Sequence, residues 1–442
     1  MDGDPAVEPQ LDALSLTLPL PYRVALLTVL GIWGWGANLH YLYGIKIDVP
    51  GLIRYPSRAS SAQAPHYRTA YRLAATAATG VGLSLVFFWL LTRRDPSRVL
   101  AYDWLPMTTL GGLALLLLVP LPRRLQQLLR PSAASTAGGS GGGGGGNVVP
   151  LWASLPQDGR RRFAAMVRRV ALGGLAEPQH GKFGDVLLAD VVTSYAKVLG
   201  DVFVCVCMFF FPSSPGREAS ATDRPDRDCG GAVIVPLIMA APSAARLRQC
   251  LIEYVRARRA REPGGQHLAN ALKYFSAFPV IVLSALQRPD GSPGDASAAS
   301  LRQAWIIAVL INSLYSFYWD VTRDWDLTLL TEARDSVGQP WGLRRRLYIR
   351  PAPQIYYAVI AMDLMLRCTW SLKLSPHLGR VGAHGDFESS LFLMELLEVF
   401  RRWVWIFFRV ETEWIRTTGN AALGADDLLL GDYQGKYDDE DD

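Results

Sequence analysis

Long apolar stretches alternate with short polar ones along most of the chain of 442 residues. A transmembrane helix needs about 20 mostly apolar residues. Because several of the stretches are short or contain charges, we expect roughly eight to ten spans. The pattern predicts an all-α, polytopic integral membrane protein with a helical bundle in its C-terminal part. The apolar stretches lie at 22–44, 73–92, 104–122, 186–211, 231–245, 271–286, 303–319, 354–373 and 391–408.

Polar segments divide these stretches into regions. The run PSAASTAGGSGGGGGGNVVP (131–150) cannot bury a core, so it predicts a flexible linker. In chain order we predict a short polar segment, N-terminal transmembrane helices, the linker, a C-terminal transmembrane domain and an acidic tail. Their bounds are 1–21, 22–130, 131–159, 160–420 and 421–442.

A basic stretch follows the linker. RRRFAAMVRRVALGG (160–174) interleaves arginines with apolar residues. This pattern is typical of a helix that lies on a membrane surface. It is equally typical of a short positive loop at the cytosolic face of a membrane protein.

Composition supports a membrane protein and argues against some partners. Half of the residues are hydrophobic and 19% are charged. The net charge of +5 is spread over loops, so we expect no nucleic-acid partner. The first residues, MDGDPAVEPQLDALSLTLPLP, lack the basic region and cleavage site of a signal peptide. We therefore expect the first helix to stay in the protein as an anchor.

The five cysteines have no metal-ligand spacing, and their odd number argues against a full disulfide framework. Cys205 and Cys207 lie in the apolar run VFVCVCMFFF, where we expect them to be small buried hydrophobes. The sequence therefore predicts neither a metal site nor a cofactor.

The second half of the chain places ionisable residues within its apolar stretches, or at their ends, again and again. Each charge at the middle of a bilayer costs about 2.5 to 3.5 kcal/mol. Seven or eight such charges facing lipid would cost roughly 20 kcal/mol, which exceeds the marginal stability of a folded protein. They must therefore face one another or water. The residues are Asp190, Lys197, Asp201, Lys273, Asp363, Arg367, Arg401 and Arg402.

Helical spacing groups some of these charges. Asp320 and Asp324 are four residues apart, which predicts two carboxylates on one helix face. Asp363 and Arg367 have the same spacing with opposite signs. Two adjacent carboxylates repel unless a cation or a proton lies between them. The charges therefore predict contacts between several helices.

The presence of both signs favours an anion as the ligand. A cation pathway would need carboxylates alone, whereas Lys273, Arg367, Arg401 and Arg402 together predict an anion site. The planar guanidinium matches two phosphate oxygens at once. Carboxylates in the same cavity could hold the arginines when the site is empty, and could accept hydrogen bonds from a protonated phosphate.

The same charges have structural interpretations that the sequence leaves open. Arginines near a helix end can snorkel to the interface. A helical pair of opposite sign can be purely structural, and residues near the end of a span can lie in a loop or at the interface. These alternatives apply to Arg401 and Arg402, to Asp363 with Arg367, to Asp320 with Asp324, and to Lys273 with Tyr274.

Several stretches resemble one protein family. WDVTRDWDL (319–327) is similar to the W-D-x-x-x-D-W-x-L pattern of the EXS domain, which occurs in eukaryotic phosphate exporters. The likeness covers about residues 180 to 420, with a weaker echo in WGWGANLHYLYGI of the first helix. The other similar stretches are RLRQCLIEY (246–254), HLANALKYF (267–275), YYAVIAMDLMLRCTW (356–370) and LEVFRRWVWIFFRVETEW (397–414).

The resemblance implies a phosphate-binding pathway in the C-terminal EXS bundle. It coincides with the charges that the apolar pattern had already indicated. Two positions depart from the family: Asp326 stands where glycine is usual, and Thr193 stands where larger exporters carry asparagine. Carried over by motif, the pathway residues are Asp190, Lys273, Tyr274, Asp320, Asp324, Arg367, Trp370, Arg401 and Arg402.

The chain resembles the short fungal members that lack the regulatory SPX domain and are associated with the Golgi. In those members, loss impairs the retention of luminal ER proteins and of glycosyltransferases. The resemblance implies return of luminal phosphate, a by-product of glycosylation, to the cytosol. It implies a multi-pass Golgi protein, with the ER or another endomembrane as the alternative location. The implied partners are inorganic phosphate, membrane lipids, Golgi glycosyltransferases or vesicle-coat factors, and a second copy of the chain.

Two other functions stay open at this point. The chain could be a non-transporting adaptor that sorts glycosyltransferases into retrograde vesicles. It could also be a membrane transferase that holds a divalent metal between Asp320 and Asp324, although such chemistry usually needs more carboxylates. We expect a transporter rather than an enzyme.

Overall fold

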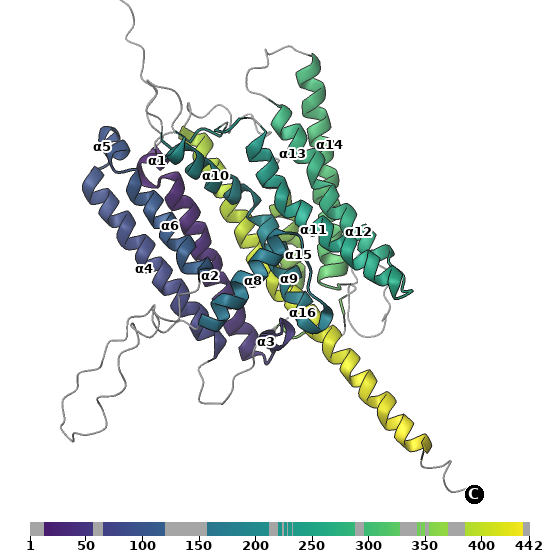
Figure 1. Cartoon of the computed structure of the whole chain (residues 1–442). Helices are drawn as coiled ribbons and strands as arrows, with labels where there is room; N and C mark the ends of the chain where they lie inside the picture. Colours follow the sequence, from purple (N-terminus) through teal and green to yellow (C-terminus); the bar gives the residue numbers. More distant parts are fainter. Residues whose placement is uncertain are drawn as a thin grey trace, which may run out of the picture.

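The computed structural model describes a helical protein (Figure 1). Within the part of the chain that it describes, every regular element is a helix, which confirms the predicted all-α class. Trp370 and most of the predicted linker lie outside the described residues. These residues are 13–55, 65–119, 157–211, 220–222, 225–227, 229–231, 233–287, 296–327, 343–344, 346–349, 353–369 and 385–435.

The N-terminal helices form a group of their own, in which α2, α4 and α6 pack side by side (Figure 1). Tyr22 of α2 packs edge to face on Phe88 of α4, with ring centroids 5.6 Å apart. Its hydroxyl bonds to Ser84, which in turn bonds to Thr109 of α6. The elements are α1 (Ala13–Thr17), α2 (Leu20–Gly44), α3 (Val49–Leu52), α4 (His66–Thr92), α5 (Pro96–Ala101) and α6 (Trp104–Leu118).

The C-terminal helices surround one long helix, α16 (Gly385–Gly435), which packs against both groups (Figure 1). It contacts α2 of the N-terminal group and α9, α15 and η4 of the C-terminal group. Polar residues that several helices point at α16 therefore meet in the middle of the molecule. The remaining elements are α8 (Gln157–Ala171), η3 (Pro178–His180), α9 (Lys182–Ser194), α10 (Ala196–Phe210), α11 (Ile234–Arg259), α12 (Gly265–Phe275), α13 (Ala277–Leu286), α14 (Ala296–Trp319), η4 (Asp320–Asp324) and α15 (Pro353–Arg367).

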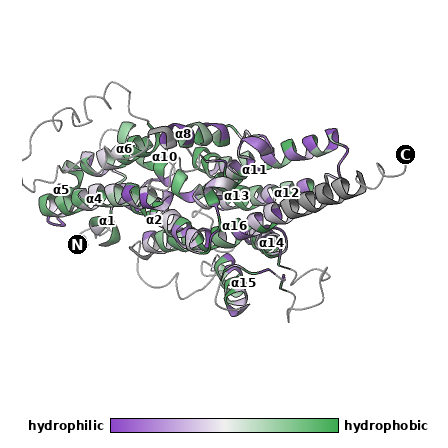
Figure 2. Ribbon diagram, turned by 90° about the horizontal axis from the view of Figure 1, so that it is seen from below, coloured by the Kyte–Doolittle hydropathy of each residue, from purple (hydrophilic) through white to green (hydrophobic). Residues whose placement is uncertain are grey.

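Where the structure describes them, the predicted apolar stretches lie mainly on helices, and the outer helices expose apolar side chains. Figure 2 shows hydrophobic colour along most of α4 and α6. By length and composition, three described helices could each cross a membrane, namely His66–Thr92, Gly265–Leu286 and Ala299–Asp324. The pair α9 and α10, bent by 65°, would add a fourth as one broken span. The chain is an all-α membrane protein.

The basic stretch after the linker is a helix, α8, so the alternative of a short positive loop is wrong. Arg169 pairs through two nitrogens with the carboxylate of Asp185 in α9, each at 2.6 Å. Arg160 donates to carbonyl oxygens at the end of α6. Arg162 and Arg168 stay exposed. Two of the five arginines that suggested a surface helix thus attach α8 to the bundle.

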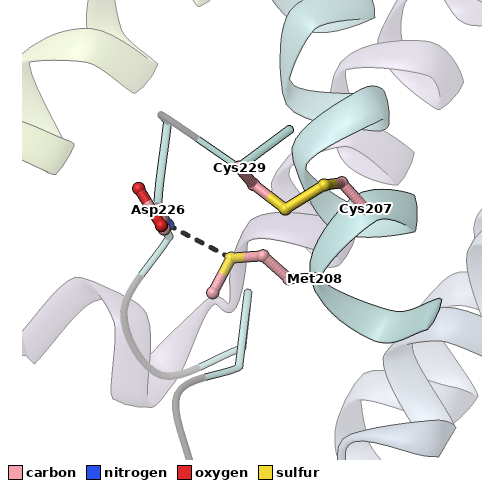
Figure 3. The surroundings of a disulfide bond; sticks show 4 residues. All are labelled: Cys207, Met208, Asp226 and Cys229. Atoms are coloured by element: carbon pink, nitrogen blue, oxygen red, sulfur yellow. Dashed lines mark hydrogen bonds between the residues drawn. A yellow bond between two sulfur atoms is a disulfide. The ribbon is translucent and has the colours of Figure 1, made fainter. Parts of the chain in front are cut away.

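One cysteine prediction is wrong. Cys207, near the end of α10, forms a disulfide with Cys229, 22 residues further along (Figure 3). Cys205 is a buried free thiol, as predicted. In the same place the backbone N–H of Asp226 donates to the Met208 sulfur at 3.1 Å (Figure 3). The pairing depends on a loop that returns to its own helix, which the parity of the cysteine count cannot show.

Candidate functional site

Seven charged side chains meet where α12, η4 and α15 face the middle of α16. Asp320 and Asp363 are fully buried, and Lys273 and the two arginines of α16 are at most 7% exposed. We call this set the central cluster. Its members are Lys273, Asp320, Asp324, Asp363, Arg367, Arg401 and Arg402.

The two carboxylates of η4 share a lysine. Lys273 Nζ lies 3.0 Å from Asp320 Oδ1 and 3.2 Å from Asp324 Oδ2. The prediction that both carboxylates occupy one face is confirmed, and of the groups that could relieve their repulsion it is a cation that lies between them. Because that cation is the ammonium group of the chain itself, the alternative of a polar loop after the span is wrong. The position that a divalent metal would need is also taken by this ammonium group.

The local backbone explains how η4 presents these groups. The helix α14 ends in five π-helical residues, Asp320–Asp324. A π-helical turn is rare and is frequently found at functional sites, because it widens the helix and redirects side chains. Asp326, which follows, has a φ of 51°. Glycine adopts such a backbone without steric cost, which fits the glycine that the family resemblance implies at this position.

Arginines from α15 and α16 converge on Asp320 from the other side. Arg367 pairs with Asp320 and, one turn along its own helix, with Asp363 at 3.0 Å. Arg401 Nη1 lies 3.0 Å from Asp363 Oδ1 and 3.5 Å from Asp320 Oδ2. Glu398 holds the remaining nitrogens of Arg401 at 2.6 and 2.9 Å. The Asp363–Arg367 pair of α15 therefore links three helices and is not purely intrahelical. Arg401 is held inside the bundle and does not snorkel to a helix end.

Arg402 differs from its neighbour in what it contacts. Its Nε donates to the hydroxyl of Ser194 at 2.8 Å, and its Nη2 lies 3.4 Å from the hydroxyl of Thr193. Its guanidinium lies 4.5 Å above the ring of Trp405. Among the described residues, no carboxylate oxygen lies within 4.0 Å of it. A buried arginine held by neutral groups keeps its charge available for an anion.

The break between α9 and α10 brings these hydroxyls into place. Thr193 and Ser194 form the last turn of α9, where the chain bends by 65°. Broken helices of this kind supply polar groups to the substrate sites of many transporters. The position that departs from the family, Thr193, thus contributes a hydroxyl beside Arg402.

A second group of polar residues lies beside the central cluster. Asp190 accepts a hydrogen bond from Tyr274 at 2.5 Å and from Arg246 Nε at 2.6 Å. Arg246 also donates to Gln249 at 2.7 Å and lies 4.8 Å from the centre of the Tyr274 ring. The charge of Asp190 is therefore already balanced by a buried arginine that was not predicted as a site residue.

The structure brings together every described residue of the predicted site. Lys273 and Tyr274 are buried and are not at an interface. Sequence reasoning missed Arg246, Ser194 and Glu398. Arg246 was visible as the first residue of a family-like stretch, and Glu398 stands one helical turn before Arg401. That these residues handle phosphate stays a prediction.

The arrangement can exchange internal ion pairs for an external anion. Removing one partner of a buried pair leaves an uncompensated charge, so each displaced carboxylate must find another cation. The cluster offers such alternatives, since Asp320 faces three cations and Asp324 is held by Lys273 at 3.2 Å. A ligand with several acceptor oxygens could replace a carboxylate at the arginine forks.

Comparison with known proteins shows the family of the chain. The EXS family matches residues 18–415. The chain is 34% identical over 259 residues to Protein ERD1 homolog 1 of Schizosaccharomyces pombe, covering 58% of this chain and 62% of that protein. It is 24% identical over 424 residues to Protein ERD1 homolog 2 of the same organism, covering 89% and 96%. It is 28% identical over 272 residues to human Solute carrier family 53 member 1, covering 58% and 37%. The chain belongs to the EXS family.

Proposed function

We propose that the chain transports inorganic phosphate through the central cluster, from the lumen of the Golgi to the cytosol. One observation carries this proposal. Arg402 is buried beside Arg401 and, within the part of the chain that the structure describes, is held by hydroxyl groups rather than by a carboxylate. A protein that needed this arginine only for stability would gain more from a charged partner, since an unbalanced buried charge is costly.

The chemistry of the cluster suits phosphate. Arginine forks bind two phosphate oxygens each, and a lysine adds a third contact. Monohydrogen and dihydrogen phosphate also carry O–H groups, and Asp320 and Asp324 can accept hydrogen bonds from them. Because a transport site must release its ligand, a mixture of both signs suits conduction better than a purely basic cage. The family resemblance and the solute-carrier name of a relative support the same substrate class and process.

Two observations suggest which end faces the lumen. Disulfides form and persist in oxidising compartments, so the end with Cys207 and Cys229 faces the lumen. Cytosolic ends of membrane proteins are rich in arginine and lysine. Arg256, Arg258 and Arg259 lie in the last turn of α11, about 33 to 38 Å along the helix from its first residue, which follows the disulfide closely. The two criteria give one orientation, with the arginine-rich end in the cytosol.

The location and the biological role are part of the proposal. The relatives named ERD1 and the resemblance to the short fungal members support an endomembrane location, for which we propose the Golgi. Glycosyl transfer from nucleotide sugars releases phosphate in the lumen, and its removal would support the retention of glycosyltransferases and of ER proteins. In this account, sorting defects follow from the accumulated phosphate.

The test is the flux of radiolabelled phosphate into proteoliposomes that contain the purified protein. We expect the wild type to carry phosphate and Arg402→Gln to lower the flux at least about tenfold, because a charged hydrogen-bond donor is lost. Arg168→Gln is the matched control, since it removes an exposed arginine of α8. Its flux should equal that of the wild type.

Each outcome separates the alternatives. Wild-type vesicles that carry no more phosphate than empty ones would exclude the transporter. If the Arg402→Gln variant, folded to the same extent, still supported sorting in cells, the adaptor would be the better account. A loss of both flux and retention in this variant would support phosphate transport as the cause of the sorting role.

A further inference from the structure

Charged residues recur at every seventh position along α16. Seven residues make nearly two turns, so these positions share one stripe that drifts by only about 20° per repeat. Carboxylates occupy the part near the disulfide, and arginines occupy the part toward the arginine-rich end. The first four residues are at most 9% exposed, and the last is exposed. The stripe consists of Glu388, Glu395, Arg402, Arg409 and Arg416.

Arg409 is the first charge of this stripe beyond the central cluster. Its Nη1 donates to Glu413 at 3.0 Å, one turn along the same helix. Its Nε lies 4.0 Å from Asp324 Oδ1, and its guanidinium lies 5.0 Å from the ring centre of Phe183. In the described part of the chain, no carboxylate of another helix lies within 3.5 Å of it, whereas Arg401 has such a partner in Asp363. Arg409 is therefore buried, and its charge is only weakly paired with carboxylates of other helices.

Asp324 is the member of the central cluster that lies between Lys273 and Arg409. One of its oxygens lies 3.2 Å from Lys273 Nζ, and the other faces Arg409 at 4.0 Å. An anion bound at Lys273 is thus one carboxylate away from the next cation. If that anion displaced Asp324 from Lys273, the carboxylate could pair fully with Arg409. If the anion moved on to Arg409, Asp324 could return to Lys273.

Beyond Arg409, the stripe reaches the surface. Arg416 lies in α16 one repeat further on, with 43% of its side chain exposed. Its Nη2 donates to the carbonyl oxygen of Arg323 at 2.8 Å and lies 3.8 Å from Asp326. The buried cluster and the arginine-rich end are therefore connected by arginines on one face of one helix.

We propose that Arg409 is a second anion-binding site on the path, between the central cluster and the arginine-rich end, and that Asp324 closes the step between the two sites. Asp324 pairs with Lys273 or with Arg409 in turn, so that the anion and the carboxylate exchange places. Arg416 receives the anion at the mouth. This inference rests on the proposed function, because it names the next step of the same transport.

Flux in proteoliposomes tests the second site, with phosphate concentration varied. Arg409→Gln should lower the maximal rate about tenfold, because one charged donor is lost. Its half-saturating phosphate concentration should stay within about twofold of wild type, since the central cluster is intact. Arg409→Lys keeps the charge and should restore part of the rate. Arg416→Gln changes an exposed residue and should lower the rate by a smaller factor.

Glu413→Gln is the control for a merely structural role. It removes the same ion pair as Arg409→Gln but leaves the arginine, so we expect it to keep at least about half of the wild-type rate. An equal loss in both variants would show that the pair matters only for structure and would overturn the second site. An unchanged rate in Arg409→Gln would overturn it as well.

The two proposals fail in different ways. Wild-type vesicles without phosphate flux would overturn the proposed function and the second site together. Wild-type flux that Arg402→Gln abolishes and Arg409→Gln leaves unchanged would overturn the second site alone.

Discussion

Two buried ion networks lie against α16, and they differ in how completely their arginines are paired. The first is the central cluster. The second, which we call the end network, lies near the disulfide and consists of Arg23, Asp201, Arg227 and Glu388. Arg23 pairs with Glu388 at 2.7 Å, and Arg227 pairs with Asp201 at 2.6 Å and with Glu388 at 3.3 Å.

Arg23 and Arg402 show the difference most clearly. All three guanidinium nitrogens of Arg23 donate, to Leu18, to Ser15 and to the carboxylate of Glu388. Arg402 donates only to two hydroxyl groups among the described residues. A fully paired arginine attaches α2 to α16 and has nothing left for a ligand. Burial of charge alone therefore does not indicate a binding site, whereas incomplete pairing does.

The largest effect should follow Asp320→Asn. This change leaves Lys273, Arg367 and Arg401 facing a neutral amide, so we expect it to destabilise the protein by about 3 to 5 kcal/mol. Phosphate should restore part of the loss, because it can supply the missing negative charge. Thermal unfolding of the purified variant with and without phosphate measures both effects.

A phosphate effect no greater in Asp320→Asn than in the wild type would contradict this prediction. Sodium chloride at equal ionic strength serves as the control for general screening.

The corresponding change in the end network is Glu388→Gln, for which we expect a loss of about 3 kcal/mol. Glu388 accepts from both arginines, so its neutralisation leaves Arg23 buried without a charge partner. Phosphate should not restore the loss, since this network has no site for it. The second substitution Arg23→Gln should restore part of it instead. Restoration by phosphate would mean that the two networks do not differ as argued.

The third effect concerns the disulfide that holds the end network. Its loop of 22 residues predicts a stabilisation of about 3 kcal/mol in the chain-entropy account. Cys207→Ser should therefore lower the unfolding temperature, and phosphate flux well below that temperature should be unchanged. Cys205→Ser, at a buried free thiol, is the matched control. A loss of flux without a loss of stability would show that the disulfide end takes part in transport.

The sequence could predict the central cluster, whereas of the end network it indicated only Asp201, and the reason is physical. A charge inside an apolar stretch is costly in a membrane unless it is paired. Asp363 and Arg401 can therefore be recognised from the sequence as residues that need a partner. A charge near the end of a helix, such as Arg23 or Glu388, is usually solvated, so the sequence gives no reason to expect a buried partner for it. Their pairing joins residues 365 positions apart, which only the packing of α1 and α2 against α16 brings together.

The details of the site also escaped prediction. The i, i+4 spacing of Asp320 and Asp324 correctly placed both carboxylates on one face, but it assumed an α-helix where the chain is π-helical. Arg402 has hydroxyl partners and, among the described residues, no carboxylate partner. The hydroxyl groups are placed by the bend between α9 and α10, which no local pattern at 193–196 predicts. The apolar pattern thus determined the fold class and the place of the charges, and tertiary contacts determined which charge is available.

The smallest effect tests the backbone beside the central cluster. Asp326 has a φ of 51°, a conformation that costs an L-residue about 1 kcal/mol or more. Asp326→Gly should remove this strain, and the greater freedom of glycine in the unfolded chain should offset part of the gain. Its ion pair with Arg416 is long and exposed, so its loss matters little. We expect a net stabilisation of about 0.5 kcal/mol, measured by thermal unfolding. Asp326→Ala removes the same carboxylate and keeps the Cβ atom, so it should not stabilise; equal effects of both variants would locate the cause in the charge and not in the backbone.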